Sequence, residues 1–432
     1  MALHVLDEAK MCLGCPKPRC QQGCPIGTDI PSVIKLLKAG KLDEAGQKLF
    51  ENNPLTTVCS LVCNHEKQCE GNCVRGIKGT PVHFSVIENY ISRTYAYKMT
   101  RGPAPQNGMK AAIIGSGPAG LTIAVELARK GYAITIFEAR DKIGGMMRYG
   151  IPDFRLPDSV LDDFQYRHLE LKGVKVRTNT VIGKSISLDD LFRDGYKAVF
   201  IGAGLWKART LHIKGESLGN AVFGIDYLAN PTAFRLGDNI AVIGAGNSAM
   251  DCARTAIRNG ARHVTCYARR DEISASEHEV SYAQLEGVAL VKCRVPVEIR
   301  ENGVIFCENA RKEDGSWAAV PGSEMLHPHT GVIISVSQGP EENVANGSEK
   351  KIETTAKGLL EIDENGATSR PGVYAGGDAV LGARTVVEAV AIAKRVAGAM
   401  DAYMQSLPVD TASDPYANLP VYDTTASDAL AR

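Results

Sequence analysis

The first hundred residues place their apolar side chains at helical spacing and show almost no strand pattern. Asp29 and Pro31 are typical of a helix start, because aspartate caps a first turn and proline fits inside it. Three helices are predicted from apolar residues three or four positions apart: Val33, Ile34 and Leu37; Leu42, Ala45, Leu49 and Phe50; Ile87, Tyr90, Ile91 and Tyr95. The stretch 101–108 contains glycine and proline and predicts a linker. We therefore expect a helical domain over residues 1–100.

From residue 109 the pattern changes to strand, helix and strand, and it does so twice. The first unit has apolar runs at 111–114 and 134–137, and the second unit has them at 240–243 and 264–267. In each unit a glycine-rich loop follows the first strand and opens a helix, which is typical of a nucleotide-binding βαβ unit. The chain is expected to be an α/β protein with two Rossmann-like dinucleotide-binding domains, preceded by an all-α domain.

Composition and charge exclude several classes of protein. The chain has 49 basic and 49 acidic residues, whereas a surface that binds nucleic acid requires a basic excess. No run of residues approaches the roughly 20 apolar positions of a membrane span. The first ten residues carry two acids and no apolar core, so they do not form a secretory signal, and a cytoplasmic location is expected. The polar segment 409–432 is expected to be a tail.

The first glycine loop has the features of a dinucleotide site. Its expected binding residues are Gly115, Gly117, Pro118, Ala119 and Gly120. The first glycine permits a tight turn, the second lets the backbone approach a pyrophosphate, and the third packs the helix on the strand. The helix N-terminus adds N–H groups and a favourable dipole. Glu138 ends the second strand, where its carboxylate can bind ribose hydroxyls.

The second glycine loop comprises Gly244, Gly246, Asn247, Ser248 and Ala249. Aligning the two units puts Ala268 where the first unit has Glu138, with Arg269 and Arg270 beside it. A carboxylate repels a 2′-phosphate, whereas guanidinium groups bind one. The first site therefore suits FAD and the second suits NADPH, with NADH left possible. The alternative is that the two arginines only form a solvated strand end.

A third feature completes the first site. A strand beginning at residue 372 ends in Gly377 and Asp378, and an amphipathic helix begins at Thr385 and Val386. In flavoproteins with two dinucleotide domains, such an aspartate binds the ribityl chain. The helix N-terminus directs its positive end to the pyrimidine edge of the flavin, where charge accumulates on reduction. No Cys-x-x-Cys pair accompanies either unit, which argues against disulfide-reductase chemistry.

Eight of the twelve cysteines lie between residues 12 and 73. In a large chain without an export signal, this density favours metal or cluster binding over disulfides. The spacing in residues 12–25 resembles a ferredoxin run, with three close cysteines followed by Cys-Pro. Two zinc sites are the alternative for the same count. Iron–sulfur clusters fit better beside a flavin, because a flavin accepts electron pairs and releases single electrons.

Up to about residue 405, the chain resembles the small subunit of bacterial glutamate synthase. It is equally similar to the N-terminal half of dihydropyrimidine dehydrogenase and to the large subunit of the ferredoxin:NADP transhydrogenase. The resemblance rests on the eight cysteines, both glycine loops, the Ala-Gly-Gly-Asp stretch that ends at Asp378, and the motif at 144–157. It implies a glutathione-reductase-like fold, with an FAD-binding domain at 109–207 and 336–408 and an NAD(P)H-binding domain at 208–335.

The resemblance also implies two interleaved 4Fe–4S clusters. One cluster would use Cys12, Cys15, Cys20 and Cys73, and the other Cys24, Cys63, Cys69 and a non-cysteine ligand. Family members place Gln or Glu early on the helix after the last cysteine, which corresponds to Glu88 here. The alternative for Glu88 is a solvated helix carboxylate, and Cys59 is left as a spare thiol. Gly145 and Arg148, in the motif at 144–157, would belong to the flavin site.

The resemblance implies an FAD-dependent NADPH oxidoreductase that relays single electrons through two 4Fe–4S clusters. The acceptor would be a separate catalytic subunit of the glutamate synthase or dihydropyrimidine dehydrogenase type, in a hetero-oligomer. No catalytic acid or base is expected, because hydride transfer requires only positioning. One rival interpretation is a subunit of an electron-bifurcating transhydrogenase. Another is an interaction or sensor protein that keeps the clusters but does not turn over.

Overall fold

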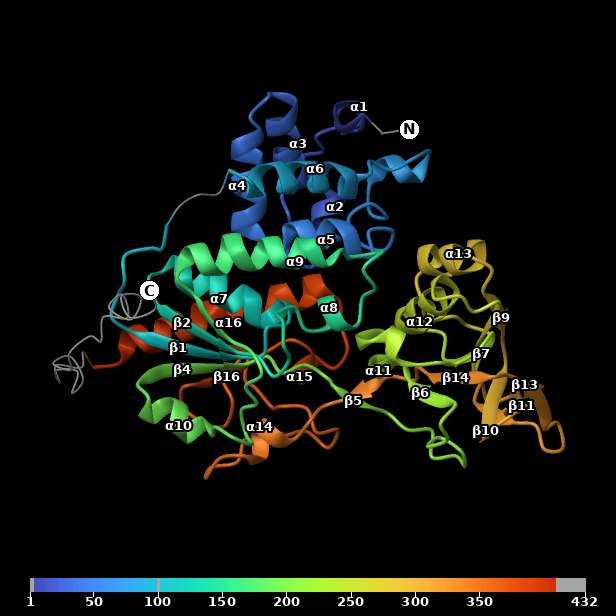
Figure 1. The fold of residues 1–432 in the computed structure, drawn as a ribbon. Coiled ribbons are helices and arrows are strands. Elements are labelled where there is room, and N and C mark those ends of the chain that lie inside the picture. Colours follow the sequence, from blue (N-terminus) through green and yellow to red (C-terminus); the bar gives the residue numbers. More distant parts are fainter. Residues whose placement is uncertain (1–3, 99–101, 409–432) are drawn as a thin grey trace, which may run out of the picture.

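The computed structural model describes residues 4–98 and 102–408 of the chain (Figure 1). The predicted tail at 409–432 lies outside the described residues. A helical domain lies above one α/β unit, and a second α/β unit lies to the side of the first (Figure 1). We call the α/β unit that contains β1 the first unit and the one that contains β7 the second unit.

The helical domain contains seven short helices in its described residues. They are α1 (Val5–Lys10), α2 (Arg19–Gln22), α3 (Ile30–Lys38), α4 (Leu42–Asn52), α5 (Thr56–Val62), the 3-10 helix η1 (Val74–Ile77) and α6 (Phe84–Ala96). Asp29 caps α3, because its side chain accepts a hydrogen bond from the backbone N–H of Ser32. Val33, Leu49 and Ile87 are fully buried in a small core between α3, α4 and α6. The three predicted helices are confirmed.

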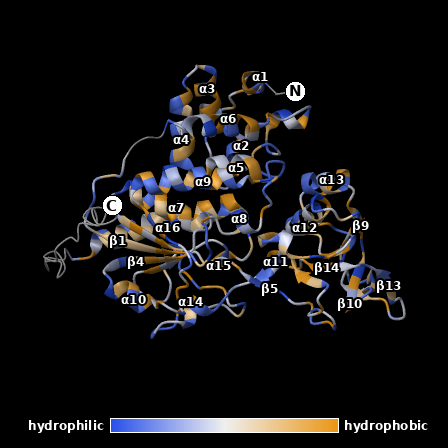
Figure 2. Ribbon diagram, viewed as in Figure 1, coloured by the Kyte–Doolittle hydropathy of each residue, from blue (hydrophilic) through white to orange (hydrophobic). Residues whose placement is uncertain are grey.

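The first unit is a parallel five-stranded sheet in the order β16-β4-β1-β2-β3. Its strands are β1 (Lys110–Ile114), β2 (Ala133–Phe137), β3 (Lys175–Arg177), β4 (Tyr196–Ile201) and β16 (Val373–Ala375). Its helices are α7 (Pro118–Arg129), α8 (Met146–Tyr149), α9 (Asp158–Phe164), the π-helix η2 (Gln165–Leu169), the 3-10 helix η3 (Glu170–Lys172), α10 (Leu188–Arg193), α14 (Asn343–Asn346), α15 (Asp378–Leu381) and α16 (Val386–Ser406). Helices α7 and α16 pack together, and Figure 2 shows their many hydrophobic residues. Strand β16 comes from the C-terminal part of the chain, so two separate segments build this sheet.

The second unit has a similar five-stranded parallel sheet, in the order β6-β14-β7-β8-β9, but its edge strand β6 is the first strand of the unit along the chain, whereas β16 is the last of the first unit. Its strands are β6 (Ala221–Phe223), β7 (Asn239–Ile243), β8 (His263–Tyr267), β9 (Ala289–Val291) and β14 (Gly331–Ile334), and its helices are α11 (Gly224–Ala229), η4 (Pro231–Ala233), α12 (Asn247–Arg258) and α13 (Glu277–Leu285). An antiparallel sheet is attached to it, made of β10 (Arg294–Arg300), β11 (Gly303–Arg311), β12 (Trp317–Ala319) and β13 (Met325–Pro328).

The chain crosses between the two units twice, along a two-stranded antiparallel ribbon. Its strands are β5 (Lys207–Ala208) and β15 (Gln338–Gly339). The predicted fold class is confirmed, because an all-α domain precedes two Rossmann-like units along the chain. The exact domain boundaries stay a prediction. Over residues 4–98 and 102–408, no helix has the length and apolar character needed to cross a membrane.

Candidate functional site

Most of the residues predicted to bind the flavin surround one cleft, which holds about 1820 Å³ of empty space. It lies at the carboxyl ends of the first unit's strands, where open α/β sheets bind their ligands. The predicted residues that line it are Gly115, Gly117, Pro118, Ala119, Glu138, Gly145, Gly377, Asp378, Thr385 and Val386. These positions come from four separate segments of the chain. The structure thus brings together the three features that the sequence predicts for this site.

The glycines of the first loop serve different purposes. Gly115 has φ +91°, and a Cβ there would lie 2.5 Å from the carbonyl oxygen of Gly202 on the adjacent segment. Gly120 packs helix on strand, because a Cβ there would collide with the carbonyl oxygen of Gly115. Gly117 has extended backbone angles, and a Cβ there would meet no atom within 4 Å. The fold itself therefore tolerates a side chain at Gly117, and the free space is what a pyrophosphate on this loop requires.

Glu138 holds the loop in place from the end of β2. Its carboxylate is buried and accepts hydrogen bonds from the backbone N–H groups of Ser116 at 2.9 Å and Arg140 at 2.8 Å. A carboxylate has about four acceptor positions, so it can accept ribose hydroxyls in addition. Glu138 therefore fits the predicted ribose ligand and also stiffens the loop.

Asp378 and the start of α16 form another part of the wall of the cleft. Burial raises the pKa of the Asp378 carboxyl to about 6, and its Oδ1 accepts a hydrogen bond from the backbone N–H of Arg384. Thr385 and Glu388 form a reciprocal capping box at the first turn of α16. The 21-residue helix presents its positive end to the cleft, which suits a ring system that gains negative charge.

Arg148 departs from the prediction. It is not among the residues that line the cleft. Its buried guanidinium pairs with Asp162 at 2.6 Å and with Asp158 at 3.1 Å, and its Nε donates to the carbonyl oxygen of Ile143. The structure gives this side chain the role of bracing α8 against α9. Its neighbour Gly145 does face the cleft, with φ +55° and a close approach to Gly117.

The second glycine loop lies in a cleft of its own, with about 2040 Å³ of empty space. Gly244, Gly246, Asn247, Ser248 and Ala249 line it together with Arg269 and Arg270. Both arginines are exposed at the end of β8, directly after the buried Ala268. Arg294 lines the same cleft from β10. Sequence analysis missed Arg294, because only the folding of the antiparallel sheet onto this strand end brings it there.

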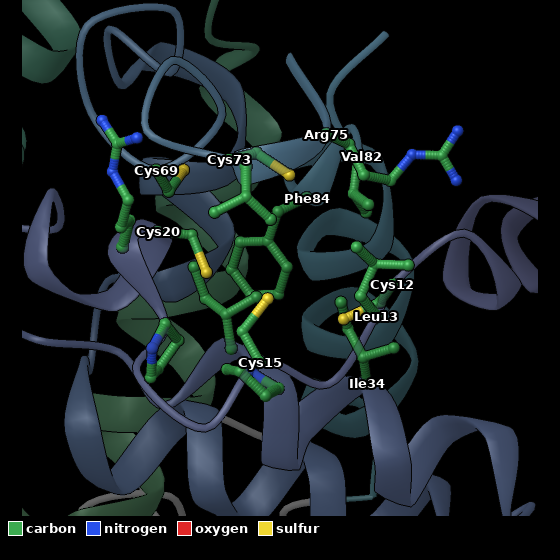
Figure 3. A pocket seen from close by; sticks show the side chains of 15 residues that line it. Cys12, Leu13, Cys15, Cys20, Ile34, Cys69, Cys73, Arg75, Val82 and Phe84 are labelled. Atoms are coloured by element: carbon green, nitrogen blue, oxygen red, sulfur yellow. The ribbon is translucent and has the colours of Figure 1, made fainter. Parts of the chain in front are cut away.

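The first set of cysteines gathers around a pocket in the helical domain (Figure 3). The pocket has about 460 Å³ of empty space, part of it open to solvent, and the labelled side chains of Cys12, Cys15, Cys20 and Cys73 line it with Ile34, Val82 and Phe84. Burial raises the pKa of the Cys20 thiol to about 11, and the charges of the other three thiols add to this shift. These four residues are the predicted ligands of one cluster, and the fold brings them together from positions up to 61 residues apart (73 − 12).

The second set, Cys24, Cys63, Cys69 and Glu88, also converges. Burial and the charges of Glu88, Glu70 and Cys24 raise the pKa of the Cys69 thiol. A hydrogen bond with Cys59, burial, and the charges of Cys59, Glu88 and Cys69 raise the pKa of Cys63. Cys69 also lines the pocket of the first set, so it lies between the two groups.

Glu88 is buried, which is not the situation of a solvated helix carboxylate. Burial raises the pKa of Glu88 to about 7, while a hydrogen bond from Thr56 at 2.7 Å partly offsets the shift. The charge of the Glu88 carboxylate contributes to the raised pKa values of the Cys63 and Cys69 thiols. This position fits the predicted oxygen ligand.

These donor sets suit a cluster, because each ligand of a 4Fe–4S cluster binds a different iron atom and the ligands need not converge on one point. Over residues 4–98 and 102–408, no three His, Cys, Asp or Glu side chains converge closely enough to hold a single ion. The twelve cysteines are free thiols. The thiols and the pocket around them therefore fit iron–sulfur clusters held by these residues.

The second unit and the helical domain both contribute residues to the wall of the first cleft. Asn247, Ser248 and Asp251 line it from α12 of the second unit, and Val62 lines it from α5 of the helical domain. Val62 directly precedes Cys63. Nothing in the sequence around Val62 indicates this position, since it depends on the packing of α5 against α16.

Comparison with known families divides the chain at the same place as its fold. A family model described as dihydropyrimidine dehydrogenase domain II, 4Fe-4S cluster, matches residues 2–100. A second model, described as pyridine nucleotide-disulphide oxidoreductase, matches residues 109–394.

Individual proteins match most of the chain. The glutamate synthase [NADPH] small chain of Azospirillum brasilense is 33% identical, over 93% of this chain and 89% of that protein. The NADP(+)-dependent formate dehydrogenase subunit beta of Moorella thermoacetica is 36% identical, over 89% of this chain and 60% of that protein. Among solved structures, Mycobacterium tuberculosis FprA in complex with NADPH superposes with a TM-score of 0.58 at 18% identity, over 70% of this chain and 85% of that chain, which shows a shared fold.

Proposed function

Since this chain belongs to the pyridine nucleotide-disulphide oxidoreductases, in the group that contains the glutamate synthase small chains, we propose that it is an NADPH-oxidising electron-input subunit. It is an FAD-dependent oxidoreductase with an iron–sulfur domain. In this proposal it takes reducing equivalents from NADPH and delivers single electrons to a separate catalytic subunit. The family match supports a subunit of a larger enzyme of the glutamate synthase or dihydropyrimidine dehydrogenase type.

One observation carries the proposal. The first cleft is lined at once by the first glycine loop, by the start of α12 and by Val62, the residue before Cys63. A cofactor in this cleft would lie against the start of α12 and against Val62, the residue before the proposed cluster ligand Cys63. When bound there, FAD accepts a hydride and releases single electrons, and the clusters carry one electron at a time.

Each segment of the chain has a distinct role in this proposal. The backbone around Gly117 and the N-terminus of α7 bind the FAD pyrophosphate, and Glu138 binds a ribose. Asp378 faces the ribityl chain, and the N-terminus of α16 stabilises negative charge on the flavin ring. The loop around Gly246 binds the NADPH pyrophosphate, while Arg269 and Arg270 bind the 2′-phosphate.

The remaining residues bind the two proposed 4Fe–4S clusters. One set is Cys12, Cys15, Cys20 and Cys73, and the other is Cys24, Cys63, Cys69 and Glu88. Val62 supports the second set as the one nearer to the flavin. We also propose the domain division 1–100, 109–207 with 336–408, and 208–335, because the sheets are built from these segments.

The test is an anaerobic titration of the full chain, loaded with FAD, iron and sulfide, first with NADPH and then with NADH. We expect NADPH to bleach the flavin absorbance and then to produce EPR signals of reduced clusters. Bleaching without cluster signals, in a chain that contains zinc, would mean that the protein is only a flavin reductase and that the cysteines do not bind iron–sulfur clusters.

A second experiment tests the second ligand set. Glu88→Ala should change the EPR signal or the potential of one cluster while flavin content stays the same. Cys59→Ala is the matched control, because Cys59 lies beside Cys63 but is a spare thiol in this assignment. An unchanged cluster spectrum in Glu88→Ala would remove Glu88 from the ligands.

A further inference from the structure

A loop of the first unit reaches across to the second unit and inserts two side chains there. The loop connects α8 to α9, and Leu156 anchors it, because this side chain is buried in the core of the first unit. The two preceding residues, Phe154 and Arg155, contact helices α12 and α13 of the second unit. Two neighbouring residues of one loop are thus bound to different units: Leu156 packs in the first unit, and Arg155 pairs with residues of the second unit.

Arg155 makes a fork of ion pairs. Its Nη1 donates to both carboxylate oxygens of Asp251, at 2.9 and 2.7 Å, and its Nη2 lies 2.6 Å from Oε1 of Glu279. The other oxygen of Glu279 accepts from Arg254 at 3.1 Å. All four side chains are at most 14% exposed. Within the described part of the chain, Asp251 has no ion-pair partner besides Arg155.

Phe154 adds a second contact beside the first. Its ring lies under the guanidinium groups of Arg254, at 4.6 Å, and Arg258, at 4.1 Å. Both arginines also pair with Glu286, so three arginines face three carboxylates and the network is neutral. A buried charge without its partner is costly. Moving the second unit away from the loop would leave Asp251 in that state.

The rest of the connection between the units is slight. The ribbon of β5 and β15 has two residues in each strand, and a two-stranded ribbon of this size is marginally stable by itself. Helix α8 also touches α11. The orientation of one unit against the other therefore depends also on the contacts that Phe154 and Arg155 make.

Asp251 lies one turn after Asn247 on α12, and both residues line the first cleft. The N-terminus of this helix is also the proposed binding site of the nucleotide pyrophosphate. A buried ion pair is weak evidence for stability, and its best attested use is to fix register. Holding Asp251 therefore holds the end of α12 against the flavin cleft.

We infer that Phe154 and Arg155, bound to α12 and α13, form an interdomain latch that positions the nucleotide for transfer to the first cleft. Arg155 is a positioning residue in this inference, which rests on the proposed function of the two glycine loops. The latch acts on the rate at which a bound nucleotide reacts and leaves its affinity nearly unchanged, because the second loop and its arginines lie outside the network.

The test uses the full, flavin-loaded chain. The principal variant is the double substitution Arg155→Met and Asp251→Asn, which leaves no buried charge unpaired. Arg155→Lys is the conservative variant, and Arg167→Met is the matched control, because Arg167 pairs with Asp163 inside the first unit. Asp251→Asn alone replaces the double variant if the latter does not fold.

The first readout is backbone hydrogen exchange without nucleotide. We expect the amides of residues 150–157 and of α12 to exchange at least about tenfold faster in the double variant. Because Arg155 and Asp251 also line the first cleft, flavin content is measured and the reduction rate is expressed per bound flavin. The second readout separates rate from affinity. Flavin reduction at saturating NADPH should fall about 10- to 100-fold, since small misplacements of a reacting group have effects of this size. NADP⁺ affinity should stay within about threefold, and Arg155→Lys should restore part of the rate.

Unchanged exchange together with an unchanged rate would overturn the latch, and so would parallel losses of rate and affinity. If the wild-type chain is not reduced by NADPH at all, the proposed function fails instead. In that case hydrogen exchange still decides whether Arg155 and Asp251 hold the two units together.

Discussion

The two Rossmann-like units are built alike and differ where they would meet their ligands. Both sheets have five parallel strands and share four of them in the same order, β4-β1-β2-β3 and β14-β7-β8-β9, whereas the fifth, at the edge, is the last strand along the chain in the first unit (β16) and the first in the second unit (β6). Both units have a glycine of positive φ at the first loop position, +91° at Gly115 and +140° at Gly244. A Cβ at either glycine would strike a carbonyl oxygen at the end of the neighbouring strand, that of Gly202 or Ser335. The backbone of both loops is therefore set by the same packing requirement.

The difference lies at the end of the second strand. The first unit has the buried carboxylate of Glu138 there, which also holds Ser116, whereas the second unit has Ala268 followed by exposed arginines. In the proposed assignment, this difference suits the first site to ribose hydroxyl groups and the second to a phosphate, on nearly the same backbone. Under the proposed function, the comparison teaches that the shared backbone of the loops provides for a pyrophosphate and that the side chains at the end of the second strand select the nucleotide.

The largest effect should come from filling the middle glycine of either loop. Gly117→Val should leave the chain folded but with less than about a tenth of the wild-type flavin, because the side chain occupies the pyrophosphate space. Gly246→Val should keep the flavin and weaken NADP⁺ binding more than about 100-fold, or about 2.7 kcal/mol. Flavin absorbance and calorimetric titration measure the two outcomes.

Gly219→Val is the matched control for both, since a side chain at this exposed glycine also has open space. A Gly117→Val chain with normal flavin content would show that the first loop does not hold a pyrophosphate.

The next effect concerns nucleotide choice. Replacing both Arg269 and Arg270 by Ala should weaken NADPH binding about 30- to 100-fold and leave NADH nearly unaffected, because only NADPH has the 2′-phosphate that a guanidinium group binds. The ratio of kcat/KM for the two nucleotides is the measurement. Arg262→Ala serves as the control, since Arg262 is an exposed arginine that pairs with Asp238. An unaltered ratio would support the alternative interpretation, in which Arg269 and Arg270 only form a solvated strand end.

A smaller effect is expected at Glu138. Glu138→Gln keeps the shape of the side chain but removes its charge and replaces one acceptor oxygen by an NH2 donor, so one of the bonds from the backbone N–H groups of Ser116 and Arg140 is lost and FAD affinity should fall about tenfold. Fluorescence titration of the flavin-free chain with FAD measures this change. Nucleotide affinity at the second loop should not move, and a loss at both sites would indicate a general loss of folding.

The smallest expected effect is a pH dependence of folding stability that arises from Asp378 in the first unit. Burial raises the folded-state pKa of Asp378 to about 6 from 3.8, so the folded chain holds a proton that the unfolded chain has lost between these values. Its contribution to stability therefore falls as pH rises from about 4 to about 6. In the flavin-free Gly117→Val chain, Asp378→Asn should gain about 1–2 kcal/mol relative to its parent by pH 7, and much less at pH 4.5.

Thermal unfolding between pH 4.5 and 7 measures this difference. Asp226→Asn is the control, since Asp226 follows β6 of the second unit and is exposed. A gain that is the same at every pH would contradict the role of burial at Asp378.

Local features of the sequence predicted much of the fold. Asp29 caps α3 as expected, and the apolar runs around both glycine loops are β1, β2, β7 and β8. These predictions succeed because capping, turns and apolar periodicity act between residues that are close in the chain. The antiparallel sheet of β10 to β13 was not predicted, and the boundaries between domains stay a prediction.

The sequence by itself determined which types of site are expected in this chain. Two glycine loops, the exchange of Glu138 for Ala268, and a dense block of cysteines are chemical facts that need no coordinates. Only the tertiary structure decided which groups meet. It turned Arg148 away from the cleft, placed Val62 in its wall and paired Arg155 with Asp251, 96 positions later in the chain. The physical reason is that burial and ion pairing depend on distances in space, which local patterns along the chain do not contain.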